Sequence, residues 1–287
     1  TIVKKSGISH KIDIHLKNNK SKGVAIDGIP IKKASELFGM INFVFFSPED
    51  LNIIKNGPSE KRRFMDIELC QLNKIYLSDL ANYNKIVIQR NKLLKDLFFR
   101  KDLEDTLDIW DFQLAEYGQR IIEMREAFVE RLNEIIFNIH YSLSGGKENL
   151  KIVYLKNCEK ENLMEQLKLN REKDLKLKTT SVGPHRDDLG FYFDDMDIRK
   201  FGSQGQQRCA ALSLKLSEIE LVKNTTGDTP ILLLDDVLSE LDKNRQNYLL
   251  NHIHDIQAMI TCTGLDEFVN CRFSIDKIFR VTDGMVV

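Results

Sequence analysis

The sequence has no hydrophobic stretch long enough to cross a membrane. Its longest apolar runs, such as Ile231 to Leu234, fall far short of the ~20 residues that a membrane helix needs. The first residues, Thr1-Ile-Val-Lys-Lys, are polar and basic and contain no signal-peptide core. These absences argue against a membrane-spanning or exported protein, and we expect a cytoplasmic one.

Paired cysteines, low-complexity tracts and net charge are absent as well. The cysteines are odd in number and never spaced as C-x-x-C, so neither a zinc site nor a disulfide framework is expected at Cys70, Cys158, Cys209, Cys262 or Cys271. No Pro/Ser-rich or repeated tract indicates disorder. With 42 Lys plus Arg against 43 Asp plus Glu the net charge is -1, so affinity for nucleic acid would require a local basic face.

What is present is an α/β pattern. Residues 12–16 and 24–26 alternate apolar and polar side chains around a turn at 18–21, which predicts a half-buried hairpin. The apolar run at 41–46 predicts a buried strand. The run at 231–234 predicts a strand that is buried on both faces of a largely parallel sheet.

Helices dominate the middle of the chain, where Pro58 fits the first turn of one of them. Two apolar stripes, from Leu80 to Leu97 and from Leu107 to Ile139, recur at spacings of three and four residues. They predict an antiparallel pair of long helices. The second helix would be roughly 50 Å long at 1.5 Å per residue, and its stripe is interpreted as core packing.

Two acids, Asp235 and Asp236, end the apolar run at 231–234. Ligands of parallel sheets bind at the carboxyl ends of the strands. In P-loop ATPases the acid at this point helps to hold magnesium, and the next acid can accept a proton from the attacking water. Asp235 is therefore a candidate metal ligand and Asp236 a candidate catalytic base. Many α/β proteins end a buried strand in an acid, so a structural role stays open.

A serine that can cap a helix lies shortly after Phe201. Ser203 is followed by Gln204, Gly205 and Gln206, and the glycine allows the backbone to come close to a ligand. Exposed amide groups and the helix dipole would form an anion site there. Capping alone explains the serine but not the whole string, which resembles the signature motif of ABC ATPases. That motif meets the γ-phosphate of ATP held by a partner subunit.

The segment Leu238-Ser239-Glu240-Leu241-Asp242 resembles the D-loop of the same ATPases. The signature-like string, the acidic strand end and this segment follow one another closely and in the order of an ABC-type head. Such a combination is far more specific than any one of the three motifs.

Three further stretches resemble the RecF family of bacterial DNA repair proteins, and they occur in that family's order. They are FFSPEDL at 45–51, GPSEKRRF at 57–64 and GPHRDDL at 183–189. The similarity runs over nearly the whole chain. A structural or exposed histidine explains His185, and a surface ion pair explains Arg186 with Asp187, so none of them is given a catalytic role.

The resemblance implies an α/β fold, a P-loop NTPase head of ABC/Rad50 type with an inserted α-helical arm. The first part of the head would occupy residues 1–50, the mainly helical arm 51–178 and the second part of the head 179–287. The cofactors would be ATP and Mg2+, and ATP would join two copies into a homodimer. The dimer would bind single-stranded and double-stranded DNA at gaps and, with recombination mediator proteins, assist recombinase loading in DNA repair, replication and the SOS response.

The resemblance also implies roles for the candidate residues. Asp235 would act on magnesium and Asp236 on water. The residues expected to contact the partner's nucleotide or to lie at the dimer seam are Ser203, Gln204, Gly205, Gln206, Ser239 and Asp242.

The densest basic triplet before the arm is Lys61, Arg62 and Arg63. Phosphate contacts to DNA need Lys or Arg, so these three are candidates for them. A solvated helix face is the alternative explanation.

The sequence departs from an active ABC-type ATPase in several places. It contains no G-x-x-x-x-G-K-[ST] motif, and the Gly-Gly-Lys at 145–147 lacks that spacing and follows a helix. In this family the P-loop should precede residue 1, so we expect an upstream segment, weak ATPase activity of the complete protein and none of this chain alone. The predicted strand at 258–263 ends in threonine where transporter ATPases place a switch histidine, and Asp236 replaces their usual glutamate. Ser47 and Glu49 lie where many relatives have the Q-loop glutamine.

Two rival interpretations follow from these departures. A degenerate head without catalysis could serve as a scaffold, although the intact signature, strand-end acids and D-loop would then have little reason to occur together. A nucleotide-binding subunit of a transporter is disfavoured by the helical arm and the missing switch histidine.

Overall fold

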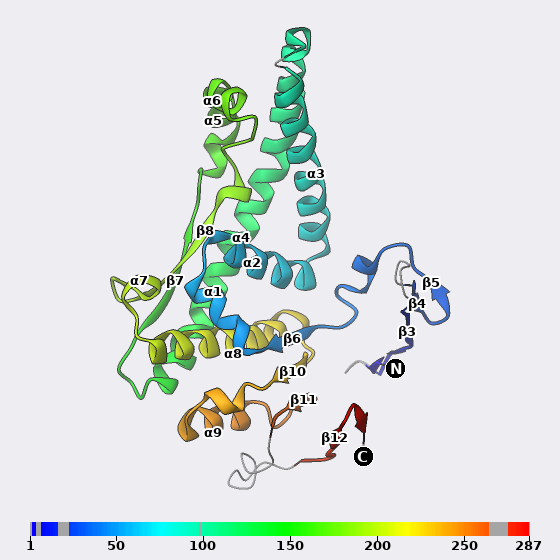
Figure 1. Ribbon diagram of the computed structural model, residues 1–287, viewed down its shortest axis with the longest axis vertical. Helices are drawn as coiled ribbons and strands as arrows, with labels where there is room; N and C mark the ends of the chain where they lie inside the picture. The colour runs from blue at the N-terminus through cyan, green and yellow to red at the C-terminus, as the bar shows by residue number, and fades with distance from the viewer. Residues whose placement is uncertain (1, 4–6, 17–22, 98, 264–274, 287) are drawn as a thin grey trace.

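The computed structural model describes residues 2–3, 7–16, 23–97, 99–263 and 275–286 (Figure 1). Two long helices rise from a body in which one helix lies across a small sheet, and both ends of the chain lie on the same side of that body. The turn predicted at 18–21 and Cys271 fall outside the described residues. Within the described ranges, no helix is both long and apolar enough to cross a membrane.

The chain begins with short antiparallel strands, which confirm the predicted hairpin. Strand β3 (Ile12–His15) pairs with β4 (Gly23–Ile26), and β4 pairs with β5 (Ile29–Pro30). Asp27 and Gly28 join β4 to β5 with φ angles of 52° and 80°, as a type I′ turn requires. The other elements of this part are β1 (Ile2–Val3), β2 (Ser9–His10), η1 (Ala34–Leu37) and β6 (Phe43–Phe46).

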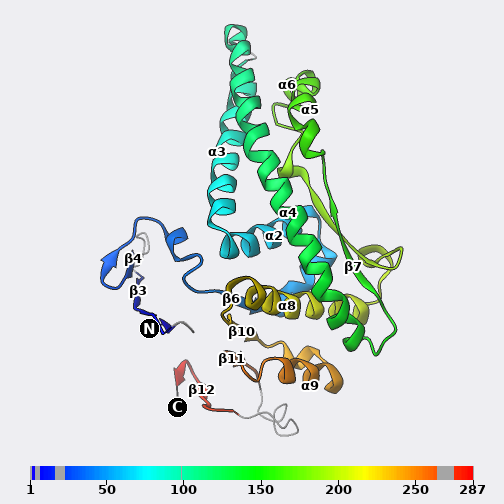
Figure 2. The same cartoon turned by 180° about the vertical axis from the view of Figure 1, so that it is seen from behind.

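The helical lobe follows β6. Pro58 begins one helix, as expected, and Asn73 caps the next by accepting from the backbone N–H groups of Ile75 and Tyr76. The lobe comprises η2 (Pro48–Asp50), α1 (Leu51–Lys55), α2 (Pro58–Leu72), α3 (Lys74–Asp96), η3 (Lys101–Thr106) and α4 (Leu107–Leu143). Helices α3 and α4 form the predicted antiparallel pair, and the 37 residues of α4 span roughly 55 Å. Seen from behind, α4 runs from the tip of the arm down to α8 (Figure 2).

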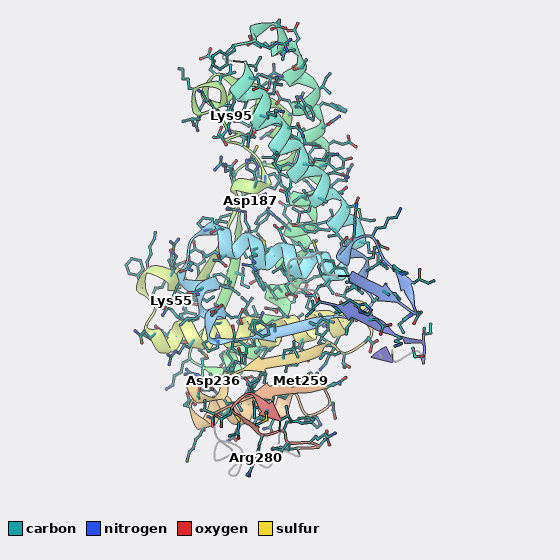
Figure 3. All side chains as sticks on the ribbon, turned by 45° about the vertical axis from the view of Figure 1, so that its right-hand side comes forward. Lys55, Lys95, Asp187, Asp236, Met259 and Arg280 are labelled. Carbon is teal, nitrogen blue, oxygen red and sulfur yellow. The ribbon has the colours of Figure 1, made fainter. Side chains whose placement is uncertain are left out.

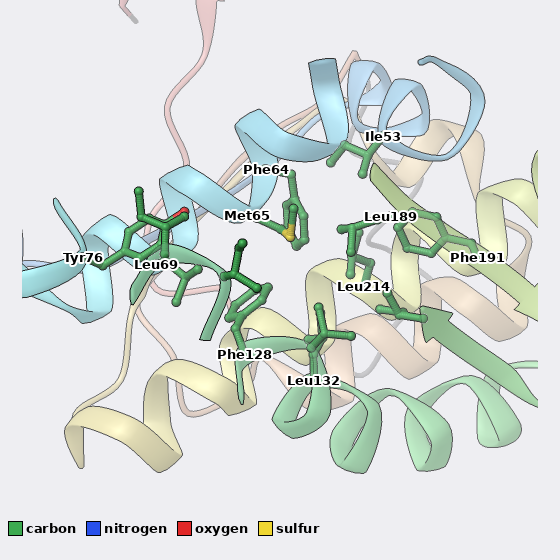
Figure 4. Close-up of a cluster of buried hydrophobic side chains, with 14 of the residues drawn as sticks. Ile53, Phe64, Met65, Leu69, Tyr76, Phe128, Leu132, Leu189, Phe191 and Leu214 are labelled. Carbon is green, nitrogen blue, oxygen red and sulfur yellow. The ribbon is translucent and has the colours of Figure 1, made fainter. Parts of the chain in front are cut away.

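The apolar stripe of α4 lies in the main core, as the sequence predicts. Leu114, Ile121, Phe128 and Leu132 are at most 4% exposed. The ring of Phe128 lies 6.2 Å from that of Phe64 on α2, and Figure 4 shows this cluster beneath α2. Burying a side chain of this size contributes about 1.5–3 kcal/mol, so the stripe is explained by packing alone.

A second sheet flanks α4. Its edge strand β7 is held by Asn133 of α4, which exchanges two hydrogen bonds of 2.8 Å with the backbone of Ile152. β7 pairs with β8 in antiparallel register, so residues on the two sides of position 178 share one sheet. The domain boundary expected there stays a prediction. The elements of this region are β7 (Leu150–Leu155), η4 (Lys160–Asn162), α5 (Leu163–Leu169), α6 (Arg171–Leu177), η5 (Pro184–Arg186), β8 (Asp188–Phe193), β9 (Met196–Asp197) and α7 (Ile198–Phe201).

A parallel sheet of order β11-β10-β6 joins the two ends of the sequence. One of its faces carries Val44, Phe46, Leu232 and Leu234, all at most 6% exposed, and it packs in one cluster with residues of α8 and α9. The elements of this region are α8 (Gln204–Thr226), β10 (Ile231–Asp235), η6 (Leu238–Glu240), α9 (Lys243–His252), β11 (Ala258–Thr261), β12 (Val281–Thr282) and β13 (Met285–Val286).

The opposite face of the parallel sheet is open. Its side chains include Phe43, Phe45 and Met259, which are 39%, 49% and 64% exposed. The prediction that the strand at 231–234 is buried on both faces is therefore wrong for the described residues, because Ile231 and Leu233 on this face are only half-buried. The reason is that α8 and α9 both pack on the same face, while parallel sheets in complete α/β domains are covered on both.

Candidate functional site

The carboxyl end of β10 is strained and has an unfilled hydrogen-bond acceptor. Asp236 has a φ of 50°, a left-handed conformation that costs a residue with a side chain about 1–3 kcal/mol. Its backbone N–H donates to the carbonyl of Thr261 at 3.2 Å. Among the described residues its buried Oδ1 has no hydrogen-bond partner. Strain and an unpaired acceptor at a strand end are typical of a functional site. Figure 3 labels this residue at the lower part of the molecule, well below Asp187 in the lobe.

Asp235 lies one residue earlier and is exposed. The hydroxyl of Thr261 donates to its Oδ1 at 2.6 Å, so this threonine orients the carboxylate. Thr261 is the last residue of β11, which therefore ends two positions before the strand end that the sequence predicts. No cluster of three His, Cys, Asp or Glu able to hold a metal exists in the described ranges. Asp235 fits magnesium only as one ligand among phosphates and waters, which is how proteins commonly hold that ion.

The start of α8 is a capping box, as the sequence predicts for Ser203. The Oγ of Ser203 accepts from the backbone N–H of Gln206 at 3.2 Å, and the N–H of Ser203 donates to Gln206 Oε1 at 2.8 Å. Because Oγ is the acceptor here, its own proton remains available to an anion. Ser203, Gln204 and Gly205 are exposed, whereas Gln206 is half-buried.

Two nearby glycines exist for different reasons. A Cβ at Gly202 would lie 2.6 Å from the carbonyl oxygen of Ile198, so packing requires that glycine. A Cβ at Gly205 would meet nothing within 4 Å, and its φ is not positive. A glycine in a helix costs up to about 1 kcal/mol relative to alanine. No contact with the described residues therefore requires a glycine at position 205, and the role expected for Gly205 beside a ligand stays a prediction.

The segment that resembles a D-loop has local structural roles. Ser239 Oγ donates to the carbonyl of Asp236 at 2.9 Å, which holds the loop against the strand end. Asp242 caps α9 by accepting from the N–H groups of Asn244 and Arg245, both at 3.1 Å. Capping is enough to explain Asp242, and its place at a dimer seam stays a prediction.

The structure brings the loops after β6 and β10 together with α8 around one small hollow. Its lining includes Ser47 and Pro48 from the first loop, Arg208 from α8, and Val237 and Leu241 from the second loop. Its volume of about 20 Å³ holds roughly one water molecule. Ser203, the serine of the signature-like string, does not line it.

The basic triplet does not form one exposed face. Lys61 is 3% exposed, and its ammonium donates to the carbonyl of Leu189 at 2.6 Å. Burial lowers the pKa of this lysine. Arg62 is half-buried and donates to the carbonyl of Asp187, while Arg63 is exposed. The prediction that Lys61 contacts DNA phosphates is therefore corrected, because β8 covers that side of α2.

The stretch at 183–189 packs against α2, α3 and α4, and we count it with the helical lobe. Gly183 has a φ of 129°, and a Cβ there would lie 2.3 Å from the hydroxyl of Tyr83. That hydroxyl is 2.7 Å from Nδ1 of His185, whose Nε2 is 3.0 Å from the carbonyl of Thr180. Burial lowers the pKa of His185 to about 4, so the ring is neutral at pH 7. This agrees with the structural role that the sequence favours for the histidine.

Arg125 of α4, which the sequence patterns did not single out, links the stretch at 57–64 and the rest of α2 to the stretch at 183–189. It is 2% exposed and donates to Asp66 Oδ1 at 2.8 Å, to Asp187 Oδ2 at 3.2 Å and to the carbonyl of Pro184 at 2.7 Å. A polar cavity of about 110 Å³ lies beside it, with His185 also in its wall. The sequence does contain a signal for this residue: an arginine stands at a position where the three-and-four spacing of the long helix otherwise places apolar side chains.

Comparison with known proteins identifies relatives over nearly the whole chain, although no model of a protein family matches it. The chain is 63% identical over 287 residues to the DNA replication and repair protein RecF of Lachnospira eligens, covering 99% of this chain and 79% of the relative. It is 62% identical over 286 residues to RecF of Agathobacter rectalis, covering 100% of this chain and 79% of the relative. RecF of Clostridium botulinum Type A is 48% identical over 273 residues, with coverage of 93% and 74%.

Solved structures show the same likeness. A structure described as the recombination mediator protein RecF-ATPrS in the RecFOR pathway has a TM-score of 0.89 at 38% identity, covering 99% of this chain and 77% of the other. The corresponding RecF-ATP structure has a TM-score of 0.86 at 37% identity. An Smc head bound to a domain of ScpA is 14% identical with a TM-score of 0.50 over 96% of this chain and 65% of the other. That last likeness concerns the fold alone, and it agrees with the predicted ABC-type ATPase head with an inserted helical arm. The chain therefore belongs to the RecF family of DNA replication and repair proteins.

Proposed function

We propose that the protein binds ATP with Mg2+ between two copies of itself, and that the resulting dimer holds DNA. The observation that carries this proposal is the start of α8, where Ser203 and Gly205 are exposed and a Cβ at Gly205 would meet no atom of the described residues within 4 Å. An unobstructed helix N-terminus with free amide groups favours an anion. Two similar solved structures are described as RecF-ATP and RecF-ATPrS, which supports ATP as the source of that anion.

The residues at the strand end would serve the same nucleotide from the other copy. Asp235, oriented by Thr261, would hold magnesium, and Asp236 would accept a proton from water with its unpaired Oδ1. The bound nucleotide would supply the phosphate charge that joins the copies. The 287 residues contain no P-loop motif, so phosphate binding would need a further segment. The open face of the parallel sheet, with Phe45 and Met259 exposed, has room for one.

Within this proposal, Ser203, Gln204 and Gly205 would contact the partner's nucleotide, with Ser239 and Asp242 at the seam. The side chain of Gln206 is already engaged inside the chain, which favours a supporting role for it. Hydrolysis would be slow, because an aspartate and a threonine take the places of the glutamate and histidine of transporter ATPases.

DNA would be bound by the dimer in the cytoplasm, at single-stranded and double-stranded segments near gaps, together with recombination mediator proteins. Arg63 on α2 is the exposed member of the basic triplet and the candidate for a phosphate contact. The similar solved structures are described as belonging to the RecFOR pathway, which supports a role with such mediators.

The proposal is tested by the mass in solution, with saturating ATP and Mg2+, of the intact protein, meaning the protein with the further segment that phosphate binding needs. We expect a dimer with nucleotide, a monomer without it, and a monomer in both conditions for Ser203→Arg. Ser59→Arg is a matched control, because Ser59 is likewise an exposed serine at the start of a helix, here α2. If Ser203→Arg dimerises like the parent, the proposed role of the signature residues is wrong. A dimer that forms equally without nucleotide would favour the scaffold interpretation.

A further inference from the structure

A chain of hydrogen bonds joins the start of α8 to the end of α4. Gln206 Nε2 donates to Glu148 Oε1 at 2.8 Å. Glu148 Oε2 lies 3.2 Å from Nε2 of His140, and Nδ1 of that ring lies 2.8 Å from the hydroxyl of Ser213. The chain thus leaves the first turn of α8, passes through the last turn of α4 and the loop after it, and returns to α8.

Burial determines the protonation state of His140 in this series of hydrogen bonds. His140 is fully buried, and burial lowers its pKa, so the ring is neutral at pH 7. A neutral ring donates through one nitrogen and accepts through the other. Glu148 can only accept when ionised, so Nε2 carries the proton. Nδ1 then faces the Ser213 hydroxyl, whose single proton is shared between this nitrogen and the carbonyl of Cys209, each 2.8 Å away. The carboxylate of Glu148 therefore receives two donors, one from α8 and one from α4.

Glu148 holds the same amide that closes the capping box. Gln206 Oε1 accepts from the N–H of Ser203, while its Nε2 donates to Glu148. With the amide fixed at both ends, the backbone of Ser203 is fixed as well. Without Glu148 the amide could rotate away, and the serine hydroxyl would lose its defined direction.

The end of α4 also supports the helix that follows the D-loop-like segment. Ile139 packs in the same apolar cluster as Leu241 and Leu249. Arg245 pairs with Asp242 at 3.0 Å, and its positive charge helps to lower the pKa of His140. One end of the arm helix thus contacts both surfaces proposed to meet the partner.

We propose that Glu148 is a positioning residue, which fixes Ser203 and its neighbours for the partner's nucleotide and ties them to the arm helix through His140. This inference rests on the proposed function of the signature residues. It predicts that the arm and the dimer surface are coupled through one carboxylate.

The test measures ATP-dependent dimerisation of the intact protein carrying Glu148→Ala, Gln206→Ala or both. A hydrogen bond to a charged group predicts a dimer dissociation constant roughly 10-fold to 100-fold higher for Glu148→Ala. The double variant should be no weaker than the weaker single variant, since the two side chains act as one unit. Glu148→Gln should stay within about 3-fold of the parent, because an amide can accept from Gln206 and donate to the other tautomer of His140.

Glu134→Ala is the matched control, because Glu134 is an exposed carboxylate on α4. Binding of a fluorescent ATP analogue to the dilute monomer should be the same in all variants, which separates positioning from loss of folding. If Glu148→Ala dimerises like the parent, or if the two losses add, the inference is wrong. If Ser203→Arg also dimerises like the parent, the proposed function has failed and the inference falls with it.

Discussion

The helical lobe and the open sheet both contain motifs that carry the resemblance to the RecF family. In the lobe the motif side chains are mostly buried or half-buried and bonded, whereas the two motif acids at the end of β10 are exposed or unpaired. In the lobe, Arg125 and Asp187 are buried and bonded to each other, and the half-buried His185 is bonded to Tyr83 and to the backbone. At the sheet, Asp235 is exposed and Asp236 is strained with an unpaired Oδ1. Distinctive residues whose polar groups are all satisfied inside the chain build the fold, whereas the strained, exposed or unpaired ones are those that we propose to bind the nucleotide.

The comparison is tested most severely by Arg125→Ala. Removing this guanidinium leaves the buried Asp187 without its ionic partner, and breaking a buried pair costs about 3–5 kcal/mol. Urea unfolding of the intact protein should show that loss. Arg131→Ala, an exposed arginine on the same helix, should change the free energy of unfolding by about 0.5 kcal/mol or less. Equal effects of the two would mean that the lobe network does not stabilise the fold.

A pH titration tests the neutral state of His185. Its pKa falls from 6.5 to about 4 in the folded protein, so the unfolded chain takes up the proton first as the pH drops. Stability from this group is complete above pH 6.5 and is lost toward pH 4, by about 3 kcal/mol. Because burial raises the pKa of Glu68 to about 7 with the opposite effect, the quantity to measure is the difference in unfolding free energy between the parent and His185→Gln. That difference should shrink as the pH falls, and a constant difference would contradict the burial argument.

Two glycine substitutions should separate the regions. Gly183→Ala, in the lobe, should cost about 1–3 kcal/mol from its φ of 129°, with a further loss from the contact with Tyr83. Gly205→Ala, at the start of α8, should leave thermal stability unchanged or slightly higher but weaken ATP-dependent dimerisation. A destabilised Gly205→Ala protein would show that the fold itself needs that glycine.

The smallest effect is expected for DNA. Arg63→Ala should weaken binding a few-fold for any sequence and reduce the salt dependence by about one phosphate contact. Lys61→Met should leave the salt dependence unchanged, because its ammonium is bonded to Leu189. Fluorescence anisotropy at several salt concentrations measures both. If Lys61→Met reduced the salt dependence and Arg63→Ala did not, Lys61 would be the residue that contacts DNA phosphates.

Sequence patterns predict the local features of this protein well. The long helices, the Ser203 cap and the acids at the end of β10 depend on spacing within a few residues, and all are present. The burial of Lys61 and the network of Arg125 depend on partners far along the chain, at Leu189 and Asp187. The exposure of Phe45 depends on which face of the sheet is covered. Such properties follow from tertiary packing, which hydrophobic periodicity does not specify.

The central claim is that a strand end in one copy and a signature segment in the other form one site. It is tested most directly by mixing the Ser203→Arg and Asp236→Asn variants of the complete protein, which includes the segment that supplies the P-loop, and measuring ATP hydrolysis. Each variant alone has a defect in both of its sites, whereas the mixed dimer contains one intact site. The account predicts that the mixture hydrolyses ATP faster than the sum of its parts. A mixture no more active than that sum would contradict it.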